Sequence, residues 1–284
     1  MVPYVETEQL LDVAKLAEEL GFEGVMGSDH ALFPRSLESR YPYSADGAPP
    51  ITGDTIYPDP WVSTAAMAAV TTTLKFSTSV YILPLRNPIE VAKATGTLSL
   101  LSGGRFILGA GVGWMKEEFD ACGVDFSTRG RRMDETIDVL HKLWGNDWVD
   151  HRGEFFHYDG IKLSPSPGQS VPIFTGGSSK PALRRAARVG QGWIGNGNHP
   201  DEVPSLLQQL QGYREEYGRD TLPFETVIGL TTPPDLDTFK RLRDQGMTAG
   251  VNYPFSLIFG RDSSLDEKRR VMEQFAESFI VKLA

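Results

Sequence analysis

The sequence predicts an α/β fold built as a single (β/α) barrel, and three observations support this prediction. Short apolar runs of strand character alternate with amphipathic helical stretches, which is typical of βα units around a parallel sheet. The length of 284 residues suits one large barrel, a fold that often runs to about 250 residues. Because no repeat or long linker divides the chain, we expect one domain over residues 1–284.

The hydrophobic periodicity predicts the order of the elements. The first helix is expected over residues 10–20, with Thr7 as its N-cap and Gly21 just beyond its end, where glycine is favoured. Further helices are expected at residues 61–71, 88–101, 131–144, 180–189, 201–217, 235–245 and 265–283. Strands are expected at residues 24–28, 75–80, 105–110, 171–175, 192–195, 225–230 and 248–253.

These elements include seven strands, whereas a closed barrel of this kind has eight. The chain begins where the first helix is expected, so the first strand is predicted to be missing or truncated at the N-terminus. The alternative is a barrel that closes in an unusual way. Truncation is favoured, because an open parallel barrel leaves an unpaired edge and an uncovered core.

Two stretches, at about residues 31–60 and 146–170, interrupt the alternation of strands and helices. Both contain several Pro and Gly residues without periodicity, and long irregular insertions in compact domains are usually functional or disordered. The first stretch follows the strand that ends in Asp29-His30, and loops that follow barrel strands lie on the active-site face. We therefore expect residues 31–60 to cover a substrate.

The composition argues against several classes of function. With 28 Lys and Arg against 37 Asp and Glu, the formal net charge is -9, which argues against a nucleic-acid partner. No apolar run approaches the roughly 18 residues that a membrane span needs, and no secretory signal is visible. Cys122 is the single cysteine and the histidines lack zinc-site spacing, so we expect neither an intrachain disulfide nor a metal site. The composition therefore favours a cytoplasmic enzyme that acts on a small molecule.

Asp29-His30 is the first candidate for catalysis, because the catalytic groups of barrels lie at the carboxyl ends of strands. A histidine there can donate or accept a proton near neutral pH. The structural interpretation is that Asp29 caps the following turn and His30 makes a structural hydrogen bond. Position alone leaves both interpretations open.

A Gly-rich run at residues 109–113 (GAGVG) follows another expected strand. Its glycines would let the backbone approach a ligand closely, or would simply form a tight barrel turn. The run matches the dinucleotide fingerprint poorly, because the third glycine of G-x-G-x-x-G would fall at Trp114. Gly111 and Gly113 are therefore candidate ligand contacts outside a Rossmann fold.

Anion binding is predicted at two further places. Gly176, Gly177 and Ser178 join an expected strand to a helix start, where N–H groups, hydroxyls and the positive helix end form a cradle suited to phosphate. A helix start capped by Ser or Thr is the alternative. The basic run Arg129–Arg132 also lies at a helix start, where cations are unfavourable unless an anionic ligand or an acidic neighbour compensates them.

The order and spacing of these motifs resemble the luciferase-like monooxygenase superfamily over most of the chain. The resemblance implies a TIM (β/α)8 barrel, and the chain looks most like the branch of deazaflavin coenzyme F420-dependent oxidoreductases. The resembling stretches are residues 17–22 (AEELGF), 28–30 (SDH), 101–105 (LSGGR), 109–114 (GAGVGW), 129–132 (RGRR), 134–135 (DE), 176–177 (GG) and 184–193.

The resemblance also implies roles for individual residues. Asp29 would lie beside the deazaflavin ring, and His30 would lie near the reacting centre as the catalytic residue. A non-prolyl cis peptide behind the ring is implied for the pair Ser79-Val80. The Gly-Gly-Ser segment that begins at Gly176 matches the phosphate site of the family.

The tail of F420 carries a phosphate and several glutamates, so it needs a local basic groove in this acidic chain. Arg129, Arg131 and Arg132 are candidates for that groove. Trp114 stands where some deazaflavin-dependent sugar-phosphate dehydrogenases have a glutamate proton donor, so that substrate class is not expected. The pair Glu117-Glu118, one helical turn further on, is expected to cap the helix.

The implied function is hydride transfer between a small organic substrate and F420, with the protein supplying positioning and a proton relay. The alternative is an FMN-dependent monooxygenase that uses reduced flavin and oxygen. Two hypotheses from other classes are a non-catalytic flavin- or deazaflavin-binding protein and a barrel lyase or isomerase acting on a phosphorylated sugar. The resemblance also implies a homodimer, because family members are often dimers.

Overall fold

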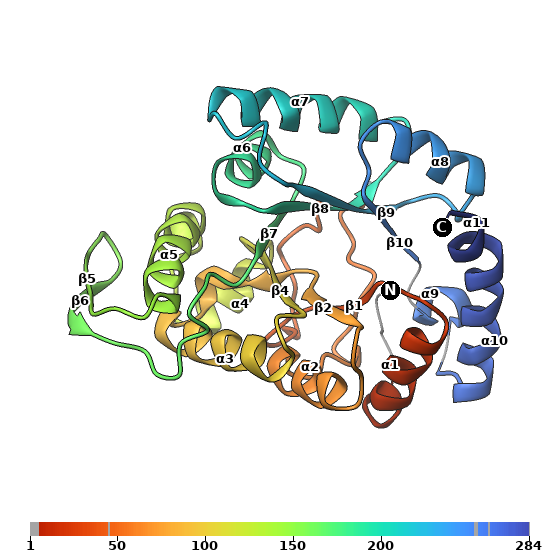
Figure 1. Ribbon diagram of the computed structural model, residues 1–284, viewed down its shortest axis with the longest axis horizontal. Helices are drawn as coiled ribbons and strands as arrows, with labels where there is room; N and C mark the ends of the chain where they lie inside the picture. Colours follow the sequence, from red (N-terminus) through yellow and green to blue (C-terminus); the bar gives the residue numbers. More distant parts are fainter. Residues whose placement is uncertain (1–5, 45, 253–254, 261, 284) are drawn as a thin grey trace.

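The computed structural model describes residues 6–44, 46–252, 255–260 and 262–283. Its centre is a curled, eight-stranded parallel sheet (Figure 1) in the order β1-β2-β4-β7-β8-β9-β10, and β3 pairs with β4. The bounds are β1 (Gly24–Gly27), β2 (Lys75–Thr78), β3 (Tyr81–Ile82), β4 (Phe106–Gly111), β7 (Ile173–Gly176), β8 (Gly192–Asn198), β9 (Glu225–Leu230) and β10 (Ala249–Val251).

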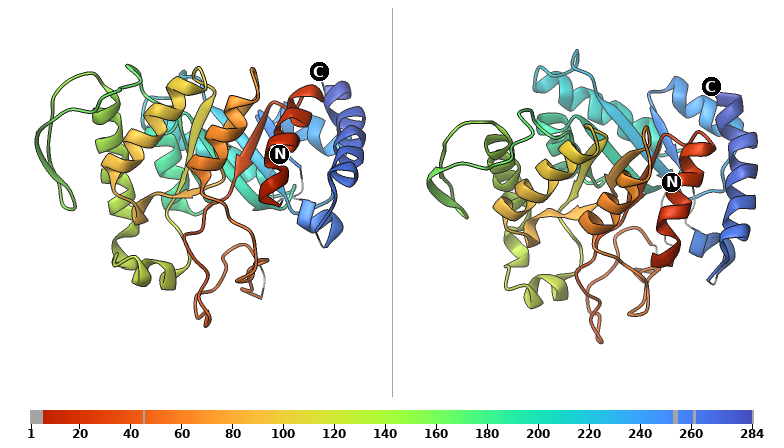
Figure 2. Two further views of the ribbon diagram at one scale, coloured as in Figure 1. Left: turned by 90° about the horizontal axis from the view of Figure 1, so that it is seen from below. Right: turned by 60° about the horizontal axis from the view of Figure 1, so that its bottom comes forward.

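Helices follow the strands along the chain and cover the outside of the sheet (Figures 1 and 2). This arrangement confirms the predicted barrel-type α/β fold. In the described part of the chain, no helix is both long and apolar enough to cross a membrane. The bounds are α1 (Leu10–Glu19), α2 (Pro60–Ala69), α3 (Pro88–Leu101), α4 (Lys116–Ala121), α5 (Arg129–Trp144), α6 (Lys180–Val189), α7 (Val203–Glu216), α8 (Leu236–Asp244), α9 (Phe255–Phe259), α10 (Leu265–Phe275) and α11 (Val281–Leu283).

The sheet ends at β1 on one side and at β10 on the other. These two strands do not pair with each other within the described residues. The predicted absence of a first strand concerns residues 1–5 and any residues before them, which lie outside the described residues.

Apolar side chains fill the space on both faces of the sheet. A cluster of strand residues (Met26, Phe174, Ile194 and Val227) packs together at the centre of the barrel. Two larger clusters lie between the sheet and the surrounding helices, and Trp144 and Trp193 are fully buried in them. Burial on both faces explains why β1 (GVMG) and β4 (FILGAG) are continuous apolar runs in the sequence.

Several predicted boundaries differ from the structure for local reasons. Thr7 opens a short 3-10 turn (η1, Thr7–Gln9) and does not cap α1, whose N-cap is Gln9, so that prediction was wrong. Gly21 has a φ of 77° and ends the helix as expected. The predicted last helix is not continuous, because a π-helical turn (η4, Ala276–Ile280) lies between α10 and α11.

The two interrupting stretches have different structures. The described residues of 31–60 form no helix or strand before α2, and in Figure 2 this orange segment extends beyond the helices on one side of the barrel. The stretch 146–170, expected to be irregular, contains an antiparallel hairpin of β5 (Val149–Arg152) and β6 (His157–Ile161). This hairpin projects from the body of the molecule next to α5 (Figure 1).

Glu18, near the end of α1, holds the turn between α2 and β2. Its Oε1 accepts hydrogen bonds from the amides of Thr73 and Leu74 at 2.6 and 2.9 Å, and the Thr72 amide donates at 2.8 Å. The Thr73 amide contributes most to lowering the pKa of the Glu18 carboxyl to about 2, and the Leu74 amide follows. Glu18 of the AEELGF stretch therefore fixes the entry into β2.

Glu18→Gln is expected to destabilise the fold at neutral pH, and this effect should vanish in acid. The pKa of the Glu18 carboxyl falls from 4.5 to about 2 on folding. Its contribution to stability is therefore fully present above about pH 4.5 and is lost as the pH falls through about 2. The free energies of unfolding in urea of the variant and the wild type should converge over that window. Glu19→Gln, at an exposed neighbour, should follow the wild type throughout.

Candidate functional site

A cavity of about 1480 Å³ lies at the carboxyl ends of the parallel strands. Barrel enzymes place their active sites at this edge, because the loops that follow every strand meet there. Most ligand pockets measure about 300–1,000 Å³, so this cavity has room for more than one bound molecule. The strand ends contribute residues 28–30, 79–80, 111–114, 176–179, 196–198, 229–231 and 251–252 to its lining.

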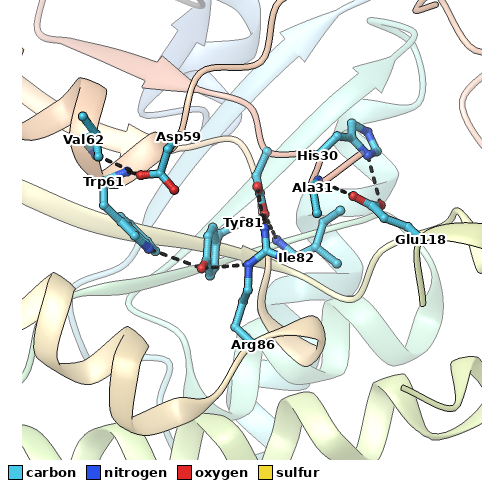
Figure 3. A network of polar contacts seen from close by, with 10 residues as sticks. His30, Ala31, Asp59, Trp61, Val62, Tyr81, Ile82, Arg86 and Glu118 are labelled. Carbon is cyan, nitrogen blue, oxygen red and sulfur yellow. Dashed lines mark hydrogen bonds and ion pairs between the residues drawn. The ribbon is translucent and has the colours of Figure 1, made fainter. Parts of the chain in front are cut away.

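Asp29 is a buried carboxylate at the end of β1, with 5% of its surface exposed. It accepts hydrogen bonds from the Ile82 amide at 3.0 Å and from the Arg86 guanidinium at 3.0 Å. Arg86 also donates to the Tyr81 hydroxyl at 3.0 Å, and Figure 3 shows the side chains of Arg86 and Tyr81 joined by this hydrogen bond. Burial raises the pKa of Asp29 above its ordinary value, while Arg86 and the Ile82 amide oppose that shift. Asp29 thus joins β1 to the segment that follows β2.

His30 lies beside Asp29 and pairs with a glutamate from α4 (Figure 3). Its Nδ1 is 3.1 Å from Oε2 of Glu118, whose side chain is fully buried. The other oxygen of Glu118 accepts a hydrogen bond from the Ala31 amide. A carboxylate at Nδ1 orients an imidazole and leaves Nε2 as the nitrogen that meets a ligand. The His30 side chain is 13% exposed and lines the cavity.

The peptide bond between Ser79 and Val80 is cis, as predicted. Three groups hold the Ser79 residue in place. Asn196 Nδ2 donates to the Ser79 hydroxyl at 2.7 Å, and the Ser28 hydroxyl donates to the Ser79 carbonyl at 3.3 Å. The Ser79 amide donates to the Gly27 carbonyl at 2.6 Å. Because Ser79 and Val80 both line the cavity, the cis bond forms part of its wall.

Gly111 and Gly176 flank the Val80 side chain. A Cβ atom added at Gly111 would lie 2.3 Å from Val80 Cγ2, and one at Gly176 would lie 2.7 Å from Cγ1. Gly113 has a φ of 79°, and a Cβ there would lie 2.7 Å from Ile82 Cγ2. All three glycines line the cavity, but the groups that already crowd them belong to the protein itself. Close packing against Val80 and Ile82 therefore explains why these positions are glycines, without a ligand contact.

The segment from Gly177 to Ser179 leads from β7 into α6. Gly177 adopts a φ of 101°, and the Ser178 hydroxyl donates to Asn198 Oδ1 at 2.9 Å. The first turn of a helix leaves its amides without intrahelical partners, and α6 begins directly after Ser179. The geometry is compatible with the predicted phosphate cradle.

The basic run Arg129–Arg132 is split by the structure. Arg129 lines the cavity, lies over the Phe126 ring at 3.8 Å, and keeps its Nε buried without a partner in the described residues. Arg131 does not line the cavity and pairs at the surface with Glu154, at 3.1 Å. Arg132 donates to the Pro84 carbonyl at 2.9 Å. Of this run, Arg129 is the residue that a cavity ligand would meet.

Several buried polar atoms of the lining have no partner among the described residues. These are Nδ2 of Asn198, Oδ1 of Asn252, Nε of Arg129 and Oε2 of Glu117. Buried polar groups are nearly always hydrogen-bonded, so unpaired ones in a cavity indicate where a ligand or ordered water would bind. These two donors and two acceptors therefore fit a large polar ligand.

The sequence-based prediction missed residues that define this site. Glu117 and Glu118 do not cap α4, whose N-cap Met115 has no side-chain cap bond, and that expectation was wrong. Glu118 instead holds His30, while Glu117 accepts from the amides of residues 38 and 39 at 2.7 and 2.9 Å. Arg86 gave no local signal. The position of the two glutamates one turn after a Gly-rich strand end was the available clue.

With this geometry established, a family comparison identifies the chain. The family model described as luciferase-like monooxygenase matches residues 3–238. The chain belongs to this family. The predicted resemblance to luciferase-like proteins is therefore confirmed, and the family includes oxidoreductases and monooxygenases.

Related luciferase-like sequences align along nearly the whole chain. An uncharacterised protein of Mycobacterium tuberculosis is 38% identical over 277 residues, which cover 96% of this chain and 95% of that protein. The F420-dependent glucose-6-phosphate dehydrogenase of Nakamurella multipartita is 28% identical over 282 residues, covering 96% of this chain and 78% of that enzyme.

Solved structures share the luciferase-like fold. The monooxygenase RslO1 from Streptomyces bottropensis superposes with a TM-score of 0.80 at 19% identity, covering 99% of this chain and 98% of the other. An F420-dependent secondary alcohol dehydrogenase, in complex with an F420-acetone adduct, superposes with a TM-score of 0.76 at 16% identity and the same coverage. At these identities the likeness supports the fold alone.

Gly111→Ala is expected to destabilise the protein by about 1–3 kcal/mol, because its new methyl group would overlap Val80. Val80→Ala in the same chain should restore most of the lost stability, since it removes both methyl groups of Val80, including the Cγ2 that the new Cβ at position 111 would overlap. Gly27→Ala is the matched control, because a Cβ there would meet nothing within 4 Å. The measurement is the free energy of unfolding across this double-mutant cycle. Additive effects, or an equal loss in the control, would contradict the packing role.

Proposed function

We propose that this protein is an oxidoreductase that transfers a hydride between F420 and a small organic substrate. The observation that carries the proposal is the cavity, whose lining brings together His30, the cis pair Ser79-Val80 and the segment from Gly177 to Ser178. The likeness to the F420-dependent dehydrogenase of Nakamurella multipartita supports F420 as the cofactor.

The lining suits a large flat cofactor with a phosphate-bearing tail. We assign Ser79 and Val80 to the cofactor ring, because both residues line the cavity together with His30. Gly177, Ser178 and Arg129 are assigned to the phosphate, since they combine a helix start with a buried guanidinium nitrogen that has no partner among the described residues. When bound, F420 supplies the hydride chemistry, and the protein supplies binding and orientation.

His30 is assigned as the catalytic proton donor and acceptor. Its Nδ1 is held by Glu118 at 3.1 Å, so Nε2 is the nitrogen that exchanges a proton with the substrate. Asp29 is assigned a positioning role beside the cofactor. Its carboxylate already accepts from Arg86 and the Ile82 amide, and it therefore fixes the wall that the cofactor contacts.

Titration of the protein with F420 and, separately, with FMN tests the cofactor, with cofactor fluorescence as the readout. Tight binding of F420 alone supports the proposal. A preference for FMN would overturn it in favour of the FMN-dependent monooxygenase, for which oxygen consumption is the next assay. Binding of F420 without turnover of any donor or acceptor would favour a non-catalytic carrier.

His30→Ala is expected to lower kcat/KM by about 10²–10⁴-fold, the range that a positioned acid or base contributes. The dissociation constant of F420 should stay close to that of the wild type, because the assigned cofactor contacts are elsewhere. Glu118→Gln should lower kcat less, since the imidazole remains but loses its carboxylate partner. His199→Ala, at an exposed histidine, is the control. An unchanged kcat/KM in His30→Ala would refute the catalytic assignment.

A further inference from the structure

Five rings line one side of the cavity in a continuous series, which we call the aromatic wall: Tyr57, His30, Trp114, Tyr41 and Tyr43. The ring centroids of Tyr57 and Trp114 lie 5.2 and 5.9 Å from that of His30, at interplanar angles of 77° and 82°. Tyr41 continues the series at 5.2 Å from Trp114 and 5.3 Å from Tyr43. The imidazole assigned to proton transfer is therefore flanked by aromatic rings on two sides.

Polar contacts with α4 hold the loop that carries most of this wall. Glu117 accepts hydrogen bonds from the amides of Glu38 and Ser39 at 2.7 and 2.9 Å. The Ser39 hydroxyl in turn accepts from the Lys116 amide at 2.9 Å. Glu118 holds the start of the same loop through the amide next to His30. The wall is thus formed before a substrate arrives, which lowers the entropy cost of binding.

The charges near the wall do not suit an anionic substrate. The basic residues among the described lining residues are Arg40, Lys116 and Arg129. Lys116 pairs with Asp120 at 2.5 Å, Arg40 donates to a carbonyl within its own loop, and Arg129 is assigned above to the cofactor. Glu117 adds a buried carboxylate oxygen, Oε2, for which the described part of the chain provides no donor. A phosphate placed beside His30 would meet rings and carboxylates.

We infer that the substrate is an uncharged ketone, or the corresponding secondary alcohol, with a planar apolar ring next to the carbonyl carbon. This inference rests on the proposed function. The substrate ring packs against Trp114 and Tyr57, and its carbonyl oxygen reaches His30 between them. Aromatic pairs in this geometry contribute about 0.5–1.5 kcal/mol beyond the area that they bury. Trp114 is therefore a determinant of specificity, because it binds the substrate by ring stacking and not by a polar contact.

The reduction balances with the groups named. The carbonyl carbon gains a hydride from the reduced cofactor, and the oxygen gains a proton from His30, which gives the alcohol. When bound, the reduced cofactor would supply the hydride and one proton, so that ketone and reduced cofactor give alcohol and oxidised cofactor, and His30 returns to its protonated state. Oxidation of the alcohol is the reverse.

Ligand-observed NMR on the full chain without cofactor tests this inference, with acetophenone and glucose 6-phosphate as probes. Acetophenone should bind in a way that depends on Trp114, whereas any binding of glucose 6-phosphate at the phosphate site assigned to the cofactor should be unchanged in Trp114→Ala. Trp114→Ala and Tyr57→Ala should each weaken acetophenone binding by about tenfold, whereas Trp114→Phe and Tyr57→Phe, which keep a ring, should stay within about threefold of the wild type. Trp148→Ala, at a tryptophan that is 71% exposed, is the control and should bind like the wild type.

Glucose 6-phosphate binding that is weakened in Trp114→Ala would overturn the inference, and so would unchanged acetophenone binding in both alanine variants of the wall. If an alanine variant fails to fold, the matching phenylalanine variant still decides, because a loss of acetophenone binding well beyond threefold would overturn the inference. Failure of the proposed function has a different signature. If F420 does not bind while acetophenone binding still depends on Trp114, the cofactor assignment is wrong, but the role of the aromatic wall in substrate binding is supported.

Discussion

Every pairing in the main sheet is parallel, and this constraint places the chemistry of the protein. Parallel strands need a crossover after each strand, so their carboxyl ends all lie at one edge of the sheet. The end of β1, the cis pair Ser79-Val80 and the turn at Gly177 therefore meet around one cavity, although they are far apart in the sequence. Antiparallel pairing of the same strands would have sent half of these segments to the opposite edge.

Three carboxylates that accept hydrogen bonds from distant segments turn this convergence into a defined site. Asp29 ties β1 to the segment after the cis bond, Glu118 orients His30, and Glu117 holds the loop over the cavity. Asp29 and Glu118 are buried and Glu117 is half-buried, and each carboxylate is compensated by N–H donors from a distant part of the chain. Glu117 and Glu118 both belong to α4. One short helix therefore holds both the histidine proposed for catalysis and the loop that carries most of the aromatic wall.

Local sequence patterns predicted a large part of the fold. The helices at residues 88–101 and 180–189 and the strand at 225–230 match the prediction to the residue, because strong local signals mark their ends. Asn87 caps α3 and Pro88 follows it, a start signal that depends only on neighbouring residues. The π-helical turn near the C-terminus and the two-strand hairpin after α5 were missed. Packing against neighbouring elements, absent from any short window, selects such features.

By itself, the sequence determined the class of fold, the strand end that carries Asp29-His30 and the position of the cis pair. The fold class and the strand end follow from periodicity and composition, whereas the cis pair was implied by the resemblance of the motifs to the luciferase-like family. The tertiary structure alone decided which charged groups meet. His30 and Glu118 are separated by 88 residues in the sequence, and Asp29 and Arg86 by 57. Such contacts arise only when the curled sheet brings distant crossovers together, because a side chain reaches its partner through space and not along the chain.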